Sequence, residues 1–286
     1  MKTAEAGRLI WKGLFGGVPE LRPPELKAYR QEHQEDSYTL LDVRQPGEYE
    51  KEHLPGALLI PLPQLETRLD ELDPAKPVLA YCAIGGRSRA AAEMLAGRGF
   101  KEVYSLAGGI KAWKGEKAQG PEQAGLGLIR GHESPAGLLA VAFGLEKGLG
   151  VFYQKAAAMM EDEQAAQLMN NLASIEDRHM ARVLEMFEAA GPNPDERRAM
   201  QNARSETTEG GFSVQELQNY LEQTRMGLAG LVDWAMALEA QAMDLYLRLA
   251  RQASDQAAAG ALRKIGDEEK AHLESLARLR DKYASA

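Results

Sequence analysis

The sequence predicts two domains of different classes: an α/β domain built on a parallel sheet, followed by an all-α four-helix bundle with one long crossover. Between about residues 21 and 113, short apolar runs alternate with helical stretches, as in a parallel α/β sheet. After Pro135 the strand pattern disappears and long amphipathic stretches follow. A glycine-rich segment that favours turns separates the two patterns.

The apolar runs of the first part are short enough to be buried strands. We expect strands at 38–43, 57–60, 78–81 and 102–105. The stretches between these runs have helical patterns, and one of them has proline near its first turn. We expect helices at 24–32, 63–72 and 87–97.

The second part has apolar residues at helical spacing over four long stretches. We expect helices at about 135–160, 162–190, 227–252 and 255–284. The crossover consists of a polar segment rich in proline and glycine, residues 191–211, and a short helix at 214–223. A four-helix bundle with one such crossover has the ferritin-like topology. The predicted organisation is an N-terminal arm at 1–19, domains at 20–115 and 134–286, and a linker at 116–133.

Charge and cysteine content exclude several classes of protein. The formal net charge is −8 and no long basic run occurs, which argues against a nucleic-acid partner. No run of 18 apolar residues occurs, so we expect no membrane association. The single cysteine cannot form an internal disulfide or a four-cysteine metal centre, and it suits a reducing compartment, so we expect a cytoplasmic protein.

The helical part contains an internal repeat with a constant offset of 93 residues. Glu146 and Tyr153 recur as Glu239 and Tyr246. A Glu-x-x-His pair in the second helix recurs in the fourth. The two pairs are Glu176 with His179 and Glu269 with His272. Steps of three and four residues place all of these side chains on the apolar face of their helices, where core residues belong.

Four carboxylates directed into one core would be very costly unless something neutralised them. Two divalent cations carry the four positive charges required. Carboxylate and imidazole ligands suit iron, manganese or zinc. Two helices that each give one glutamate, and two that each give Glu-x-x-His, form the ligand pattern of carboxylate-bridged di-metal bundles. Surface glutamates on solvated helix faces are the alternative.

These motifs resemble those of the rubrerythrin and ferritin-like family over about residues 134–284, notably at 174–179 and 267–272. The resemblance implies a centre of two iron ions per chain that reacts with peroxide or O₂, with manganese and zinc left open and no organic cofactor. It assigns the ligand positions to Glu146, Glu176, His179, Glu239, Glu269 and His272. Tyr153 and Tyr246 either hydrogen-bond these ligands or are plain core tyrosines.

The chain departs from the rubrerythrin pattern at two points. Ala242 stands where these proteins carry an additional glutamate, three residues after the third-helix ligand. The paired CxxC motifs of a rubredoxin module are also missing, because there is only one cysteine. We therefore expect electrons to come from an external donor such as a rubredoxin-like protein. Family members commonly dimerise, so we expect a homo-oligomer.

Cys82 follows an apolar run and precedes a loop that contains two glycines and leads into a helix. This arrangement places the thiol among backbone N–H groups, which favours a thiolate or a negatively charged persulfide. The residues of this loop are Ala83, Ile84, Gly85, Gly86, Arg87 and Ser88. Arg87 adds positive charge for an anionic substrate. A buried structural cysteine is the alternative.

Five motifs resemble the rhodanese family in their order and spacing over about residues 20–115. They lie at 40–44, 48–49, 53–57, 82–88 and 107–113. The resemblance implies that Cys82 accepts sulfane sulfur from a small donor such as thiosulfate or a polysulfide and passes it to a nucleophile, with Arg87 assisting. Asp42, Arg44 and His53 are interpreted as framework residues near the loop.

The leading hypothesis is a bifunctional redox protein. Sulfur transfer through a Cys82 persulfide would be combined with a di-iron centre that reduces peroxide or O₂ or performs redox chemistry linked to sulfur. One alternative is an iron-handling protein in which the rhodanese-like domain is a sulfur carrier or sensor. Another is an interaction scaffold with a silent Cys82.

Overall fold

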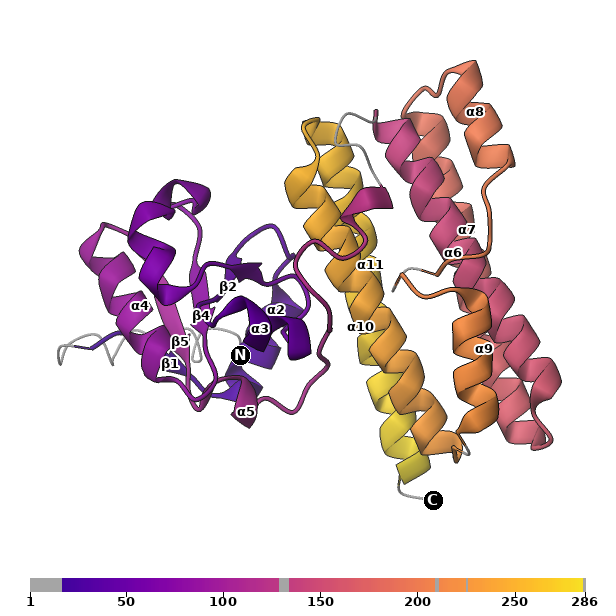
Figure 1. The fold of residues 1–286 in the computed structure, drawn as a ribbon, viewed down its shortest axis with the longest axis horizontal. Coiled ribbons are helices and arrows are strands. Elements are labelled where there is room, and N and C mark those ends of the chain that lie inside the picture. The colour runs from indigo at the N-terminus through magenta and orange to yellow at the C-terminus, as the bar shows by residue number, and fades with distance from the viewer. Residues whose placement is uncertain (1–16, 129–133, 209–210, 225, 285–286) are drawn as a thin grey trace, which may run out of the picture. The chain divides into compact units, whose positions relative to one another are not determined.

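The computed structural model describes residues 17–128, 134–208, 211–224 and 226–284 (Figure 1). Within them, the chain divides into two compact units between Glu122 and Gln123. The N-terminal arm expected at 1–19 lies outside the described residues except for its last three, and the last five residues of the expected linker also lie outside them. A short 3₁₀ helix, η4 (Leu126–Leu128), belongs to the second unit.

The first unit contains a sheet of five parallel strands in the order β1-β5-β4-β2-β3. The strands are β1 (Glu20–Leu21), β2 (Thr39–Asp42), β3 (Leu58–Leu59), β4 (Val78–Tyr81) and β5 (Val103–Leu106). The four expected strands are confirmed to within one residue at each end. Strand β1 was not expected, because two residues are too few to form an apolar pattern. All four residues of the central strand β4 are buried.

The helices of the first unit are α2 (Pro23–Glu32), α3 (Pro46–Lys51), α4 (Gly86–Gly97) and α5 (Gly109–Ala112). Alternate residues of the strands feed separate apolar clusters: Leu79 and Tyr81 pack in one, and Ala80 packs in the other. The helix expected at 63–72 is wrong. That segment forms two 3₁₀ helices, η2 (Leu62–Thr67) and η3 (Leu69–Glu71), because the prolines at its start remove the donors that an α-helix would use.

The second unit is the predicted bundle, and Figure 1 shows its four long helices side by side. They are α6 (Pro135–Met159), α7 (Glu163–Ala189), α10 (Leu228–Gln252) and α11 (Gln256–Ala284). Ser134 and Asp162 cap the first two through hydrogen bonds to backbone N–H groups. The crossover holds α8 (Pro194–Gln201), which was not expected, and the expected α9 (Val214–Gln223). Only Met200 of α8 is buried, so its apolar signal is weak.

The first bundle helix, α6, is apolar on most of its circumference because the crossover covers its outer side. A Cβ atom added to Gly148 would lie 2.1 Å from the Thr207 carbonyl oxygen, which shows how closely the two backbones approach. Among the described residues, α6 is the one helix that could cross a membrane by length and composition, with a mean hydropathy of 1.4 over 18 residues. Because 67% of that window is buried within the protein, the finding is weak evidence for a membrane span.

The interior of the bundle consists of two apolar clusters with a polar layer between them. One cluster includes Leu172 and Leu273, and the other includes Val183 and Ile265. On both α7 and α11, buried glutamates lie between the two clusters along the helix. The bundle core is therefore interrupted by carboxylates at its centre.

Candidate metal centre and candidate sulfur site

The polar layer brings together the six residues that the sequence singled out as metal ligands. They are Glu146 on α6, Glu176 and His179 on α7, Glu239 on α10, and Glu269 and His272 on α11. None of the four glutamates is more than 1% exposed. On α7 and α11, the i, i+3 spacing keeps the two members of each Glu-x-x-His pair on one face of the helix.

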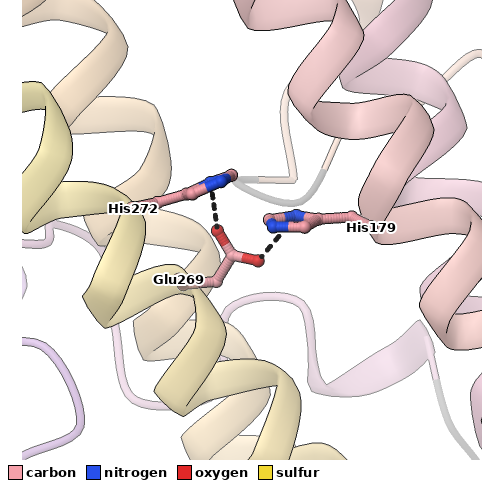
Figure 2. Close-up of side chains that lie close together, drawn as sticks. All are labelled: His179, Glu269 and His272. Atoms are coloured by element: carbon pink, nitrogen blue, oxygen red, sulfur yellow. Dashed lines mark ion pairs between the residues drawn. The ribbon is translucent and has the colours of Figure 1, made fainter.

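Each oxygen of the Glu269 carboxylate faces one of the two imidazoles, as Figure 2 shows. Nδ1 of His179 is 3.4 Å from Oε1 of Glu269, and Nδ1 of His272 is 3.9 Å from Oε2. The imidazole rings are stacked, with centroids 4.1 Å apart. His179 also lies 3.2 Å from a carboxylate oxygen of Glu146, whereas His272 lies 3.8 Å from one of Glu239.

The donor atoms form overlapping groups, each of which could hold a metal ion. Three overlapping triads hold ligand atoms within 4.8 Å of one another: Glu146–Glu176–His179, Glu176–Glu239–His272 and His179–Glu269–His272. Oε2 of Glu239 is buried and accepts no hydrogen bond from the described part of the chain. Buried carboxylates and imidazoles in this arrangement match the preferences of iron, manganese and zinc.

The close approach of α6 and α7 depends on a glycine. A Cβ atom added to Gly150 would lie 3.2 Å from the Cβ of Glu176, which is tighter than ordinary contact. Gly150 therefore leaves room for Glu176, the glutamate that two triads share.

Glu268, which precedes Glu269 in the sequence, is in a different environment, because it pairs with Arg182 at 3.0 Å.

Two buried tyrosines hydrogen-bond to the polar layer. The hydroxyl of Tyr153, on α6, donates to Oε1 of Glu239 on α10 at 3.3 Å. The hydroxyl of Tyr246, on α10, donates to Oε1 of Glu146 on α6 at 3.1 Å. The two bonds run in opposite directions between the same two helices, as the 93-residue repeat requires.

In the first unit, Cys82 follows directly after β4 and begins the loop that leads to α4. Gly85 has a φ of 102°, a conformation that glycine adopts without strain, and its N–H lies 3.1 Å from Sγ of Cys82. The loop is held from behind by Gly109. A Cβ atom added there would lie 2.3 Å from the Cys82 carbonyl oxygen, which accepts a hydrogen bond from the N–H of Ile110 at 2.8 Å.

The environment of Cys82 favours the thiolate. Burial alone would raise the pKa of the thiol. Hydrogen bonds from Ser88, through its N–H and hydroxyl, and from the N–H groups of Ile84 and Gly85 outweigh burial and lower that pKa below its ordinary value. The loop thus forms the cradle of N–H groups that the sequence predicted, and the amino-terminal end of α4 adds positive potential.

The other residues of the loop differ in their accessibility. Ile84 is 67% exposed, and Gly86 is exposed as well, whereas Gly85 and Ser88 are buried and Ala83 is half-buried. Ile84 and Gly86 are therefore the loop residues most accessible to solvent. Cys82 itself is buried.

Arg87 has a partner that the sequence did not reveal. Its guanidinium makes two hydrogen bonds of 2.7 Å to the carboxylate of Glu48 in α3. The hydrogen bonds to Arg87 lower the pKa of Glu48 to about 2, so the pair stays charged at neutral pH. Arg87 also interacts electrostatically with Cys82. Its positive charge at the loop is thus partly balanced before any anion binds.

Ser105 is a second residue that the sequence did not single out. Its hydroxyl, in β5, lies 2.9 Å from the hydroxyl of Ser88, and both serines are fully buried. Oγ of Ser88 lies 3.6 Å from Sγ of Cys82 and 3.1 Å from the Gly85 carbonyl oxygen. In the sequence, the one signal for Ser105 was that it is a small polar residue within a predicted apolar strand.

The residues interpreted as framework, Asp42, Arg44 and His53, make contacts within the first unit. Arg44 and Asp42 form a buried ion pair at 2.6 Å, and Arg44 donates to the Glu52 carbonyl oxygen at 2.7 Å. The imidazole of His53 stacks on Tyr49, with centroids 3.6 Å apart. These contacts join β2 to the segment that follows α3.

A parallel α/β domain with a cradled cysteine and a bundle with a carboxylate–imidazole layer define a protein with one sulfurtransferase-type domain and one di-metal-type domain. Family models agree: "Rhodanese-like domain" matches residues 23–116, and "Rubrerythrin" matches residues 137–280, just over half of the chain. The chain belongs to the rubrerythrin family through its bundle and to the rhodanese family through its α/β domain.

Individual relatives match the rhodanese part. Uncharacterized protein YqhL of Bacillus subtilis is 47% identical over 77 residues, which are 27% of this chain and 61% of the relative. Thiosulfate sulfurtransferase GlpE of Coxiella burnetii is 44% identical over 75 residues, 26% of this chain and 70% of the relative. A rhodanese-related crystal structure from Thermoplasma volcanium is 31% identical, with a TM-score of 0.30, and the match covers 34% of this chain and 90% of that one.

Replacement of Ser105 by alanine should make Cys82 less reactive at low pH. The Ser88 hydroxyl would lose the neighbour that orients it, and a hydrogen bond worth about 1 kcal/mol corresponds to a roughly fivefold loss of thiolate below the thiol pKa. Because Cys82 is the only cysteine, alkylation by iodoacetamide reports on it alone.

In the wild type, half-maximal alkylation should occur below the ordinary thiol pKa of about 8.5, because the pKa of Cys82 is lowered. Ser105→Ala should move the profile to higher pH. Ser37→Ala, an exposed serine in the same unit, should not move it. Identical profiles for the wild type and Ser105→Ala would show that Ser105 has no influence on the sulfur.

Proposed function

We propose that the α/β domain transfers sulfane sulfur through a persulfide on Cys82 and that the bundle reduces peroxide at a di-iron centre. The proposal of sulfur transfer rests on the contacts of the Cys82 Sγ with the Gly85 N–H and the Ser88 hydroxyl, at 3.1 and 3.6 Å. A persulfide is a larger anion than a thiolate, and the exposed Gly86 adds no side chain to the loop that would hold it. The names of the relatives support the same reaction class.

In the sulfur step, the Cys82 thiolate attacks the outer sulfur of a donor such as thiosulfate. A bond forms between the two sulfurs, the bond from that sulfur to the sulfonate breaks, and sulfite leaves with the electron pair. A thiolate or cyanide then attacks the outer sulfur of the persulfide, and the Cys82 thiolate leaves. The backbone N–H groups hold the negative charge in both steps, and Arg87 attracts the anionic donor.

In the bundle, the six residues of the polar layer would hold two iron ions, which supply one-electron redox chemistry when bound. Peroxide needs two electrons and two protons to become two water molecules, and the electrons come from an external donor. His272 is the most exposed of the six, with its side chain 17% exposed, so peroxide would enter on its side. Tyr153 and Tyr246 hold the Glu239 and Glu146 carboxylates in position for the metals.

Sulfur transfer from thiosulfate to cyanide tests the first activity. The wild type should form thiocyanate and carry one additional sulfur atom on the peptide that contains Cys82, as seen by mass spectrometry. Cys82→Ser should abolish both results, whereas Glu269→Gln should leave them unchanged because it acts on the other site. A wild-type protein that acquires no sulfur from thiosulfate or polysulfide would contradict the proposal and favour a silent cysteine.

Peroxide consumption by the iron-loaded protein tests the second activity, with a chemically reduced rubredoxin as donor. Glu269→Gln should lower the rate at least tenfold, the effect of about 1.4 kcal/mol, because it removes a charged donor from the layer. Glu268→Gln, the adjacent residue that pairs with Arg182, is the matched control and should keep the rate. Iron binding without peroxide turnover would instead favour the iron-handling alternative.

A further inference from the structure

A line of aromatic side chains runs through the bundle between the polar layer and the surface. The rings of Tyr153 and Phe152 are 5.4 Å apart between centroids, and Phe152 meets Trp234 edge-on at 5.2 Å. Trp234 in turn lies 5.6 Å from Tyr220. The four rings come from three helices, α6, α10 and α9. They are therefore brought into contact by the fold and not by sequence proximity alone.

The two ends of this aromatic line lie in different environments. At the inner end, Tyr153 is fully buried and its hydroxyl donates to Oε1 of Glu239. At the outer end, Tyr220 is 50% exposed. Trp234, between them, is half-buried. The line thus runs from Tyr153, which contacts the polar layer, to the exposed Tyr220, and each ring contacts the next.

The internal repeat shows that packing alone does not require these rings. At the offset of 93 residues, Tyr153 corresponds to Tyr246, but Phe152 corresponds to Leu245 and Trp234 to Val141. Leu245 is buried and Val141 packs against the other apolar cluster, so the counterparts occupy similar surroundings. Aliphatic side chains fill these positions in one half of the bundle. Among the described residues, the aromatic line is found in the other half.

Tyrosine and tryptophan are the aromatic side chains that are most easily oxidised, and electrons pass more readily between rings in contact than across a gap. The polar layer is buried, and the chain lacks the cysteines of a rubredoxin module. We propose that Tyr220, Trp234, Phe152 and Tyr153 form the route by which electrons from an external one-electron donor reach the polar layer. This inference rests on the proposed peroxide reduction.

The electrons balance along the route. Trp234 gives one electron inward across Phe152 and Tyr153, and Tyr220 restores it. The Tyr220 phenol releases its proton to water, which its exposure allows, and recovers it when the donor supplies an electron. Each donor molecule is oxidised by one electron, and two such transfers with two protons from water convert one peroxide to two water molecules.

Radical transfer in the metal-free protein tests the route independently of peroxide chemistry. In a variant with Trp11 and Trp113 replaced by phenylalanine, Trp234 is the only tryptophan, and azide radicals made by pulse radiolysis remove one electron from it. The tryptophanyl absorption should decay as tyrosyl absorption grows, at a first-order rate that does not depend on protein concentration. Circular dichroism verifies that each variant is folded.

Substitutions in that background locate the path. Tyr220→Phe should remove electron transfer from Tyr220 to the Trp234 radical. Phe152→Leu, which copies the residue at the repeat position, should slow electron transfer from Tyr153 to that radical. Tyr283→Phe, at the end of α11 and outside the line, is the control and should change neither. If Tyr220→Phe and Phe152→Leu both leave the decay as it is in the control, the route is overturned, whatever the iron-loaded protein does with peroxide.

Discussion

The burial of four carboxylates in the middle of a helical bundle is the constraint on which the second domain depends. Glu146, Glu176, Glu239 and Glu269 are at most 1% exposed, and two imidazoles cannot neutralise them. The two cations of the proposed function would supply the missing positive charge, and the overlapping triads gather the donor atoms that would bind them. The same layer divides the apolar core in two, so the charge balance of the layer and the packing of the helices are linked.

The first domain also buries a group that can carry negative charge, and there backbone N–H groups stabilise the charge. One cysteine sulfur is buried at the end of β4, and N–H groups of the loop and a serine hydroxyl favour its anionic form by lowering the pKa of the thiol. Glycines make this geometry available: Gly85 turns the loop, and Gly109 lets a second segment pack against its carbonyl groups. Arg87 is already paired with Glu48, so the N–H cradle contributes most of the positive potential that is free to meet a substrate.

Patterns that repeat along the chain could be predicted from the sequence, and contacts between distant segments could not. The long helices, the central strands and the inward phase of the Glu-x-x-His pairs follow from apolar periodicity. Helices as short as α5, and the 3₁₀ turns at 62–71, give too few residues for a period to appear. The Ser88–Ser105 contact and the aromatic line join different elements, so they become visible only once the topology brings β5 to the loop and α9 to α10.

The central claim, that the polar layer is a site for two metal ions, is tested most directly by anaerobic titration of the metal-free protein with ferrous iron. The account predicts saturation at two ions per chain, with a rise in the unfolding temperature of the bundle that accompanies their binding. Glu176→Gln, a change in the one glutamate that two triads share, should weaken binding at both positions. An absence of saturable binding, or binding that Glu176→Gln leaves unchanged, would contradict the claim.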